Sequence, residues 1–206
     1  RDVLGSRGLG DVYMRQIIVS YSPDNMALRH NQTQQYLETI PLYDYFFTNK
    51  SYILDNMRKL GAKNIFFVNN SYEETFHHPY NLTEQERIEL GGDVGFVGSW
   101  EQERCDSILY LADNGIKVRV FGTKEWQKYK NYSPNLKIED HGLKGIDYSK
   151  SLQAFKISLC FLRKINYDLQ TSRSVEIPAC SGFMMAERTC LLYTSPSQRD
   201  PKTSRM

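Results

Sequence analysis

The sequence lacks the signatures that identify several common classes of enzyme. Its 206 residues contain no Asp-x-Asp, no Gly-x-Ser-x-Gly and no His-Glu-x-x-His motif. Metal-dependent sugar transferases of the single-domain type, serine hydrolases and zinc proteases therefore have no support. The four cysteines form no Cys-x-x-Cys pair and show no metal-ligand spacing with the four histidines. We therefore expect no metal site and no cofactor, and we interpret the cysteines as small buried residues in a reducing compartment.

A charge imbalance and long apolar runs are also missing. The chain carries 26 Lys and Arg against 24 Asp and Glu, and this net charge of +2 gives no electrostatic case for nucleic acid or a membrane surface as partner. No apolar run approaches the length of a membrane span, and no signal peptide is recognisable. Hydrophobic residues make up 40% of the chain, as is usual for a globular domain. We expect a cytoplasmic protein without a transmembrane segment.

Strands and helices alternate along the chain. An aromatic strand, an amphipathic helix that ends at Gly61 and a further strand form one unit, and a second unit has a helix that stops at Gly115. Such strand-helix-strand units build parallel sheets, so the predicted fold class is α/β. The predicted strands are residues 16–21, 43–48, 64–68, 93–97, 117–121, 136–139, 157–162 and 183–186; the predicted helices are residues 31–40, 52–60, 100–114 and a short one with Tyr148, Leu152 and Phe155 on one face.

A polar stretch, residues 69–92, separates the two α/β blocks. It contains His77 and His78, whose side chains point apart if the segment is extended, so they are not expected to share a metal ion. We interpret the stretch as a connection between two domains and expect two separate parallel sheets that face each other across a cleft.

The segment DLQTSRSVEIPACSGFMMAE, residues 168–187, has the one spacing with a plausible chemical purpose. Asp168 and Glu176 are separated by seven residues, and Thr171 or Ser172 can cap a helix whose first turns carry Arg173 and Glu176. Ligands of α/β sheets bind outside the strand ends, where a carboxylate can accept hydrogen bonds from a ribose diol. The alternative is a surface helix with two solvated acids, and the spacing alone leaves it open.

A second candidate lies at the junction of the strand 93–97 and the helix that follows. Gly98 can let the backbone approach a phosphate, and the helix N-terminus favours an anion. Ser99 and Gln102 fit a capping box, and Arg104, one turn into the helix, can reach a phosphate. A plain tight turn and a solvated arginine explain the same residues.

Two further loops carry candidate donor-binding residues. Arg163 and Lys164 precede the acidic segment and can neutralise a diphosphate. His141 follows a predicted strand and can orient a base or a sugar. The alternatives are solvated charges and a hydrogen bond within the loop.

These residues together resemble a known group. The segments GFVGSWEQER (residues 95–104), GIKVRVFG (115–122) and ISLCFLRKINYDLQTSRSVEIPACSGFMMAER (157–188) are similar to glycosyltransferase-like proteins related to the spore-maturation protein CgeB and to YkvP, within the two-domain GT-B glycosyltransferases. In that wider group a Glu-x7-Glu motif places the first acid on the transferred sugar and the second on the donor ribose. Here Asp168 replaces the first Glu, Glu176 matches the second, and Ser181 stands where Gly is common.

The resemblance implies two Rossmann-like domains, both incomplete. Residues 1–78 would be the C-terminal part of the N-terminal, acceptor-side domain, residues 79–92 the connection, and residues 93–189 the truncated donor domain. It further implies a metal-independent transfer of a sugar from a nucleotide-diphosphate donor to an unknown acceptor, with Asp168 and Glu176 as the acids of the site and Gly98, Ser99, Arg104, His141, Arg163 and Arg173 around the donor. The alternative is a non-catalytic nucleotide- or sugar-binding module. Because both domains are incomplete, a loss of activity in the fragment itself is also expected.

The end of the chain changes character abruptly. Residues 190–206, CLLYTSPSQRDPKTSRM, show no periodicity and resemble translated sequencing adapter. We expect this stretch to be non-native and to pack against nothing. A genuine tail without regular structure is the alternative.

Overall fold

The computed structural model describes residues 16–194, and within them the chain forms two compact units that divide after Asn69. Each unit has its own parallel sheet, three-stranded in the first and five-stranded in the second. The prediction of two separate parallel α/β blocks is therefore confirmed. The division comes earlier than the expected end of the first domain at residue 78, and residues 70–92 belong to the second unit.

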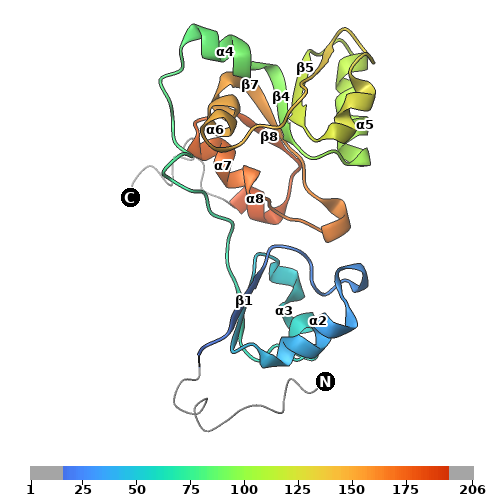
Figure 1. Ribbon diagram of the computed structural model, residues 1–206, viewed down its shortest axis with the longest axis vertical. Helices are drawn as coiled ribbons and strands as arrows, with labels where there is room; N and C mark the ends of the chain where they lie inside the picture. Colours follow the sequence, from blue (N-terminus) through green and yellow to red (C-terminus); the bar gives the residue numbers. More distant parts are fainter. Residues whose placement is uncertain (1–15, 195–206) are drawn as a thin grey trace. The chain divides into compact units, whose positions relative to one another are not determined.

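The first unit is a small parallel sheet with the order β1-β2-β3 and helices on one face. Phe46 and Ile65 pack against Ile40 and Met57 there and form its core. Its helices and strands are β1 (Val19–Ser22), η1 (Arg29–Asn31), α2 (Gln34–Thr39), η2 (Ile40–Leu42), β2 (Tyr45–Thr48), η3 (Ser51–Ile53), α3 (Leu54–Lys59) and β3 (Ile65–Phe67) (Figure 1).

Aromatic side chains lie on the other face of this sheet. The register pairs Tyr21 with Phe47 and Phe47 with Phe66, and the rings of Phe47 and Phe66 stack with their centroids 5.6 Å apart. Successive side chains of a strand point to opposite faces of the sheet. Phe46 therefore packs against the helices, while Phe47, the next residue, lies on the aromatic face.

The second unit is a five-stranded parallel sheet with the order β6-β5-β4-β7-β8. The first strand of the unit, β4, is central, and the chain adds strands to one side of it and then to the other. Its helices and strands are α4 (Glu84–Leu90), β4 (Gly92–Gly98), α5 (Gln102–Asp113), β5 (Val118–Gly122), η4 (Lys124–Tyr129), β6 (Leu136–Ile138), α6 (Gly145–Ala154), β7 (Phe155–Cys160), η5 (Lys164–Asn166), α7 (Arg173–Ala179), β8 (Met184–Ala186) and α8 (Cys190–Thr194) (Figure 1).

Both faces of this sheet are packed, as a parallel sheet requires. On one face Phe96 and Val120 contact residues of α5 and η4, among them Ile108 and the fully buried Trp126. On the other face the packing comes from α6 and α7. There Leu152, Cys160, Ile177 and Cys180 form a cluster, and Val97, Phe121 and Phe155 form another.

The polar stretch before β4 folds onto the second unit rather than serving as a bare connection. Thr83 and Glu86 form a capping box that starts α4, and the Glu86 carboxylate forms an ion pair with Lys150 of α6 at 2.5 Å. Tyr80 and Gln153 exchange two hydrogen bonds between the backbone of one and the amide of the other. These contacts explain why the unit boundary lies after Asn69.

Three local predictions differ from the structure. α5 begins at Gln102, and among the described residues no side chain caps it, so the predicted Ser99–Gln102 capping box is not formed. Phe155 is the first residue of β7 rather than part of the preceding helix face. Cys190 is exposed, whereas burial was expected for all the cysteines.

The start of the supposed foreign tail has regular structure. Residues 190–194 form the short helix α8, and the hydroxyl of Thr189 accepts from the N–H of Leu192 at 3.2 Å. The expectation that this segment packs against nothing does not hold here, because Leu191 and Leu192 are half-buried. Residues 195–206 lie outside the described part. Within residues 16–194, no helix has the length and apolar character needed to cross a membrane.

Candidate active site

The candidate residues follow the carboxyl ends of neighbouring strands in the second unit. Gly98 ends β4, His141 follows β6, and Arg163 and Asp168 follow β7. Because β4 is the strand at which the chain reverses the direction of strand addition, its carboxyl end is the point where open α/β sheets bind ligands. The fold therefore brings residues that are far apart in the sequence to one edge of the sheet. Arg173, for example, donates a hydrogen bond to Val97 at the end of β4, 76 residues away in the sequence.

Arg173 joins α7 to the end of β4. Its Nε donates to the carbonyl oxygen of Val97 at 2.8 Å, and its guanidinium carbon lies 5.5 Å from the centre of the Phe96 ring. A Cβ at Gly98 would be 2.5 Å from Nη2 of Arg173 and 2.8 Å from Cζ of Phe96. Glycine is thus needed at position 98 because the arginine packs against it. Nε1 of Trp126 also donates to the Gly98 carbonyl, at 3.1 Å.

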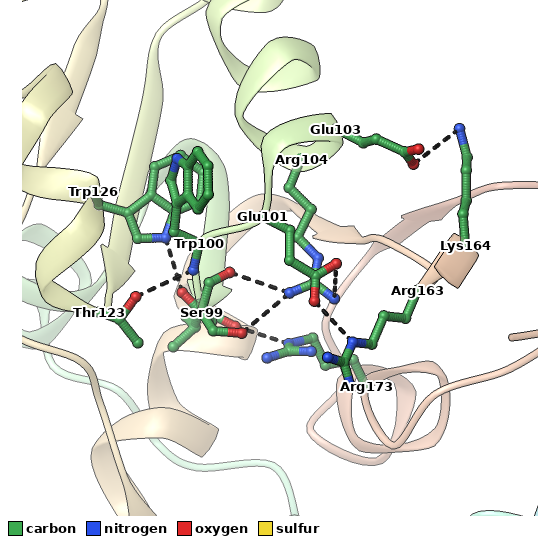
Figure 2. Close-up of polar contacts among 12 residues, drawn as sticks. Ser99, Trp100, Glu101, Glu103, Arg104, Thr123, Trp126, Arg163, Lys164 and Arg173 are labelled. Carbon is green, nitrogen blue, oxygen red and sulfur yellow. Dashed lines mark hydrogen bonds and ion pairs between the residues drawn. The ribbon is translucent and has the colours of Figure 1, made fainter. Parts of the chain in front are cut away.

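Arg104 is buried and holds the turn that precedes α5. Its Nη1 donates to the carbonyl oxygen of Ser99 at 3.1 Å and to the Ser99 hydroxyl at 3.2 Å (Figure 2). Its Nη2 lies 3.3 Å from Oε2 of Glu101, and only 6% of the residue is exposed. Arg104 therefore fixes the shape of the turn through Nη1, and its Nη2 faces Glu101.

The loop after β7 is tied to the start of α5 by two ion pairs (Figure 2). Nε of Arg163 lies 3.0 Å from Oε1 of Glu101, and Nζ of Lys164 lies 3.4 Å from Oε2 of Glu103. The N–H of Asp168 donates to the carbonyl oxygen of Arg163 at 3.2 Å. The position of Asp168 thus depends on the residue that contacts Glu101.

Glu176 lies in the first turn of α7, as predicted from the sequence. Its Oε2 accepts a hydrogen bond of 2.6 Å from the hydroxyl of Tyr148, which comes from α6. The pKa of Tyr148 is raised above its ordinary value, mainly by burial, while Arg173 opposes the shift and Glu176 adds to it. The tyrosine therefore stays protonated and holds the carboxylate in one orientation.

His141 lies at the edge of the group. Its exposed ring makes an edge contact with Phe121 at the end of β5, with the centroids 5.9 Å apart. It shares the carboxyl edge of the sheet with the other candidates, and its ring packs against the sheet at Phe121.

Charged residues of α5, of the loop after β7 and of α7 influence one another. Burial lowers the pKa of Arg104; Glu101 and Asp168 counteract this shift, and the neighbouring Arg173 and Arg163 add to it. Glu101, Asp168, Arg163 and Arg173 therefore all lie close enough to Arg104 to influence its charge.

Two functional candidates were missed by the sequence reasoning. Tyr148 was noted only as part of a helix face, and no pattern links it to a residue 28 positions away. Glu101 was not singled out, although its i,i+3 spacing from Arg104 is a recognisable helical ion pair. Among residues 16–194, no three His, Cys, Asp or Glu side chains are grouped so that they could hold a metal ion.

Comparison with known proteins places this geometry in context. Residues 103–200 match a family model described as glycosyl transferase-like. No curated protein gives a match to the chain. The family match begins near the start of α5 and includes residues 190–200, the first part of the segment that we interpreted as foreign.

Solved structures match at low sequence identity. HepE of Anabaena in complex with UDP and glucose has a TM-score of 0.59 at 10% identity over 92% of this chain, and its complex with UDP-glucose has 0.57 at 11% over 92%. A putative UDP-N-acetylglucosamine 2-epimerase from Listeria monocytogenes has 0.50 at 10% over 87%. The matches cover 58% of HepE and 52% of the Listeria protein, so the chain spans little more than half of their lengths.

These likenesses concern the fold, which is the predicted one: two parallel α/β units as in GT-B structures. The glycosyl transferase-like family model matches residues 103–200, just under half of the chain, and the structural matches show the fold alone.

Proposed function

We propose that this chain is part of a GT-B glycosyltransferase, related to the CgeB-like and YkvP-like proteins, that transfers a sugar from a nucleotide-diphosphate donor to an acceptor. The observation that carries the proposal is the link made by α7. This helix brings Arg173 to the end of the central strand and Glu176 to the adjacent position beside Tyr148. The carboxylate of Glu176 and the guanidinium of Arg173 are thereby presented together at the edge where such sheets bind nucleotides.

In this proposal Glu176 binds the donor ribose. A diol needs two acceptor positions, and the carboxylate has one oxygen already oriented by the Tyr148 hydroxyl at 2.6 Å. A hydrogen bond to a charged acceptor contributes about 1.5–3 kcal/mol. Asp168, on the loop after β7, would contact the transferred sugar.

The leaving diphosphate would be stabilised by guanidinium groups. Arg163 is 45% exposed and accessible to a ligand, and Arg173 adds positive charge from α7. Preorganised cations of this kind stabilise charge that develops on a leaving group without a metal ion. His141 would lie at the margin of the bound donor, and Arg104 would hold the turn at Ser99 through Nη1 while its Nη2 faces Glu101.

Titration calorimetry with uridine and guanosine diphosphates tests the ribose contact. UDP is the first probe, because the HepE complexes contain UDP or UDP-glucose. Glu176→Gln keeps the size of the side chain and should weaken binding about 10- to 100-fold, the equivalent of one charged hydrogen bond. Binding by the parent chain with unchanged affinity in Glu176→Gln would remove Glu176 from the ribose site.

Tyr148→Phe is the matched control for that experiment. It removes the hydroxyl that orients Glu176 but leaves the carboxylate charge in place. We expect it to weaken binding less than Glu176→Gln does, by about three- to tenfold, because one hydrogen bond to the carboxylate is lost and not the ribose ligand itself. Circular dichroism of both variants should match that of the parent chain.

The alternative is a binding module without turnover. Donor hydrolysis in the absence of an acceptor separates the transferase from the binding module. In a transferase, water can take the place of the acceptor: the sugar is transferred to water and nucleoside diphosphate is released. Asp168→Asn should lower that rate more than it lowers the affinity for the bare nucleotide. Binding without any release of nucleoside diphosphate, in the parent chain as in Asp168→Asn, would favour the non-catalytic module.

A further inference from the structure

Glu101 occupies a position between two arginines that suits a bound anion. Its Oε1 lies 3.0 Å from Nε of Arg163 and its Oε2 lies 3.3 Å from Nη2 of Arg104, so each oxygen contacts a different guanidinium (Figure 2). The two arginines come from different elements, α5 and the loop after β7, and this carboxylate contacts both of them. A phosphate or diphosphate bridges two guanidiniums with the same pattern of donors.

The two arginines differ in how freely they can change partner. Arg104 is 6% exposed, and its Nε finds no acceptor within residues 16–194. A buried guanidinium needs a nearby anion, because burial of an uncompensated charge is costly. The side chain of Arg163 is 45% exposed and that of Glu101 is 32% exposed, so either can rotate toward solvent. Arg104 is thus a fixed cation, while Glu101 and Arg163 are able to move.

The neighbouring ion pair between Lys164 and Glu103 has a different character. Its charges are 3.4 Å apart, and both side chains are at least 60% exposed. It contacts neither Arg104 nor Arg163 in any bond described above. It therefore fastens the same loop to the same helix without involving Arg104 or Arg163.

We infer that Glu101 is an internal substitute for the donor diphosphate, and that a bound nucleotide diphosphate displaces it from Arg163 and Arg104. The inference rests on the proposed function for the identity of the ligand, and it adds a competitor to the site. In the empty site Glu101 neutralises the arginines and holds the turn and loop together. When the diphosphate arrives, the carboxylate rotates to solvent and the arginines exchange one anion for another.

Such an exchange weakens donor binding but keeps the empty site ordered. Arg163 also holds Asp168 through its carbonyl oxygen, at 3.2 Å. The backbone of Arg163 can stay in place while its side chain changes partner, because the Lys164–Glu103 pair secures the loop independently. Release of a product diphosphate would be assisted by the return of Glu101.

The inference predicts the direction in which Glu101→Gln changes the affinity for UDP. Glu101→Gln keeps the shape of the side chain but removes the competing charge, and UDP should then bind about three- to tenfold more tightly at low salt. Glu103→Gln removes an equal charge from the same helix and should change the affinity by less than twofold. The difference between the two variants should shrink in 0.5 M salt, as screening predicts.

Inorganic pyrophosphate serves as a second probe, because it carries the diphosphate without the nucleoside. Tighter pyrophosphate binding by Glu101→Gln, but not by Glu103→Gln, supports the inference whatever the affinity for UDP. UDP binding that is no tighter than pyrophosphate binding would count against the proposed function and not against the inference. Unchanged or weaker binding of both probes by Glu101→Gln would mean that Glu101 positions the arginines, and it would overturn the inference. Absence of pyrophosphate binding in all variants would overturn it as well.

Discussion

Ser181 occupies a backbone position that favours glycine. Its φ is +58°, in the left-handed region, directly after α7. The N–H groups of Ser181 and Gly182 donate to the carbonyl oxygens of Pro178 and Ile177, both at 2.9 Å, which is the Schellman pattern of a helix end. The left-handed conformation costs an L-residue about 1–2 kcal/mol, and glycine avoids this cost. Glycine also makes the unfolded chain more flexible, which offsets about 0.4–1 kcal/mol of that stabilisation. Ser181→Gly should therefore stabilise the second unit by about 0.5–1 kcal/mol, or raise Tm by about 2–4 °C.

The end of α5 offers the reverse substitution as a control. Gly115 has a φ of +80°, and the N–H of Ile116 donates to the carbonyl oxygen of Leu111 at 3.0 Å in the same pattern. A Cβ at Gly115 meets no described atom within 4 Å, so Gly115→Ser adds only the backbone strain. It should lower stability by about as much as Ser181→Gly raises it, and the double variant should unfold near the parent. Urea and thermal unfolding followed by circular dichroism measure both. A lower midpoint for Gly115→Ser with no increase for Ser181→Gly would refute the reasoning for Ser181.

Three further outcomes are expected. Gly98→Ala should destabilise the second unit by about 1–3 kcal/mol in urea unfolding, because the new methyl group overlaps Arg173 and the rigid Phe96; an unchanged midpoint would show that both side chains yield freely. The hydrogen bonds from Lys150 and then from Thr83 lower the pKa of Glu86 from 4.5 to about 2, so its contribution to stability is complete above pH 4.5 and is lost as the pH falls toward 2. Lys150→Met should flatten that acid limb of the unfolding midpoint against pH, and an unaltered limb would exclude the pair as its cause. In the native chain one thiol, that of Cys190, should react rapidly with a chromogenic disulfide and the three buried ones only after unfolding, so rapid reaction of two or more would contradict the burial.

Much of the fold could be predicted because it depends on local patterns. The apolar face of α5 and the continuous buried run Val94–Val97 of β4 are visible in the sequence, and together they are typical of a parallel α/β unit. The helix stops at Gly61 and Gly115 were predicted from residue type and are confirmed by their φ values of +107° and +80°. A further signal was present but not used. Thr83 and Glu86 have capping-box spacing, and they begin the helix that makes residues 70–92 part of the second unit.

The partnerships within the site could not be predicted, because they join residues far apart in the chain. Glu101 and Arg163 are 62 residues apart, and Tyr148 and Glu176 are 28 apart. Residue type alone says that each group needs a partner, since buried polar groups are costly without one. Which partner it finds depends on strand order, and only the central position of β4 brings the start of α5 to the loop after β7.

Gly98 illustrates what a residue type can and cannot convey. A glycine between a strand and a helix correctly indicates that something approaches the backbone closely. We predicted a phosphate from this signal, and the group that the structure shows close to the glycine is the guanidinium of Arg173, 2.5 Å from where a Cβ would be. That arginine is held by the carbonyl oxygen of Val97 and starts the helix that carries Glu176. The glycine therefore acts on the candidate site through a protein contact: by admitting Arg173, it determines how closely the helix of the acid approaches the central strand.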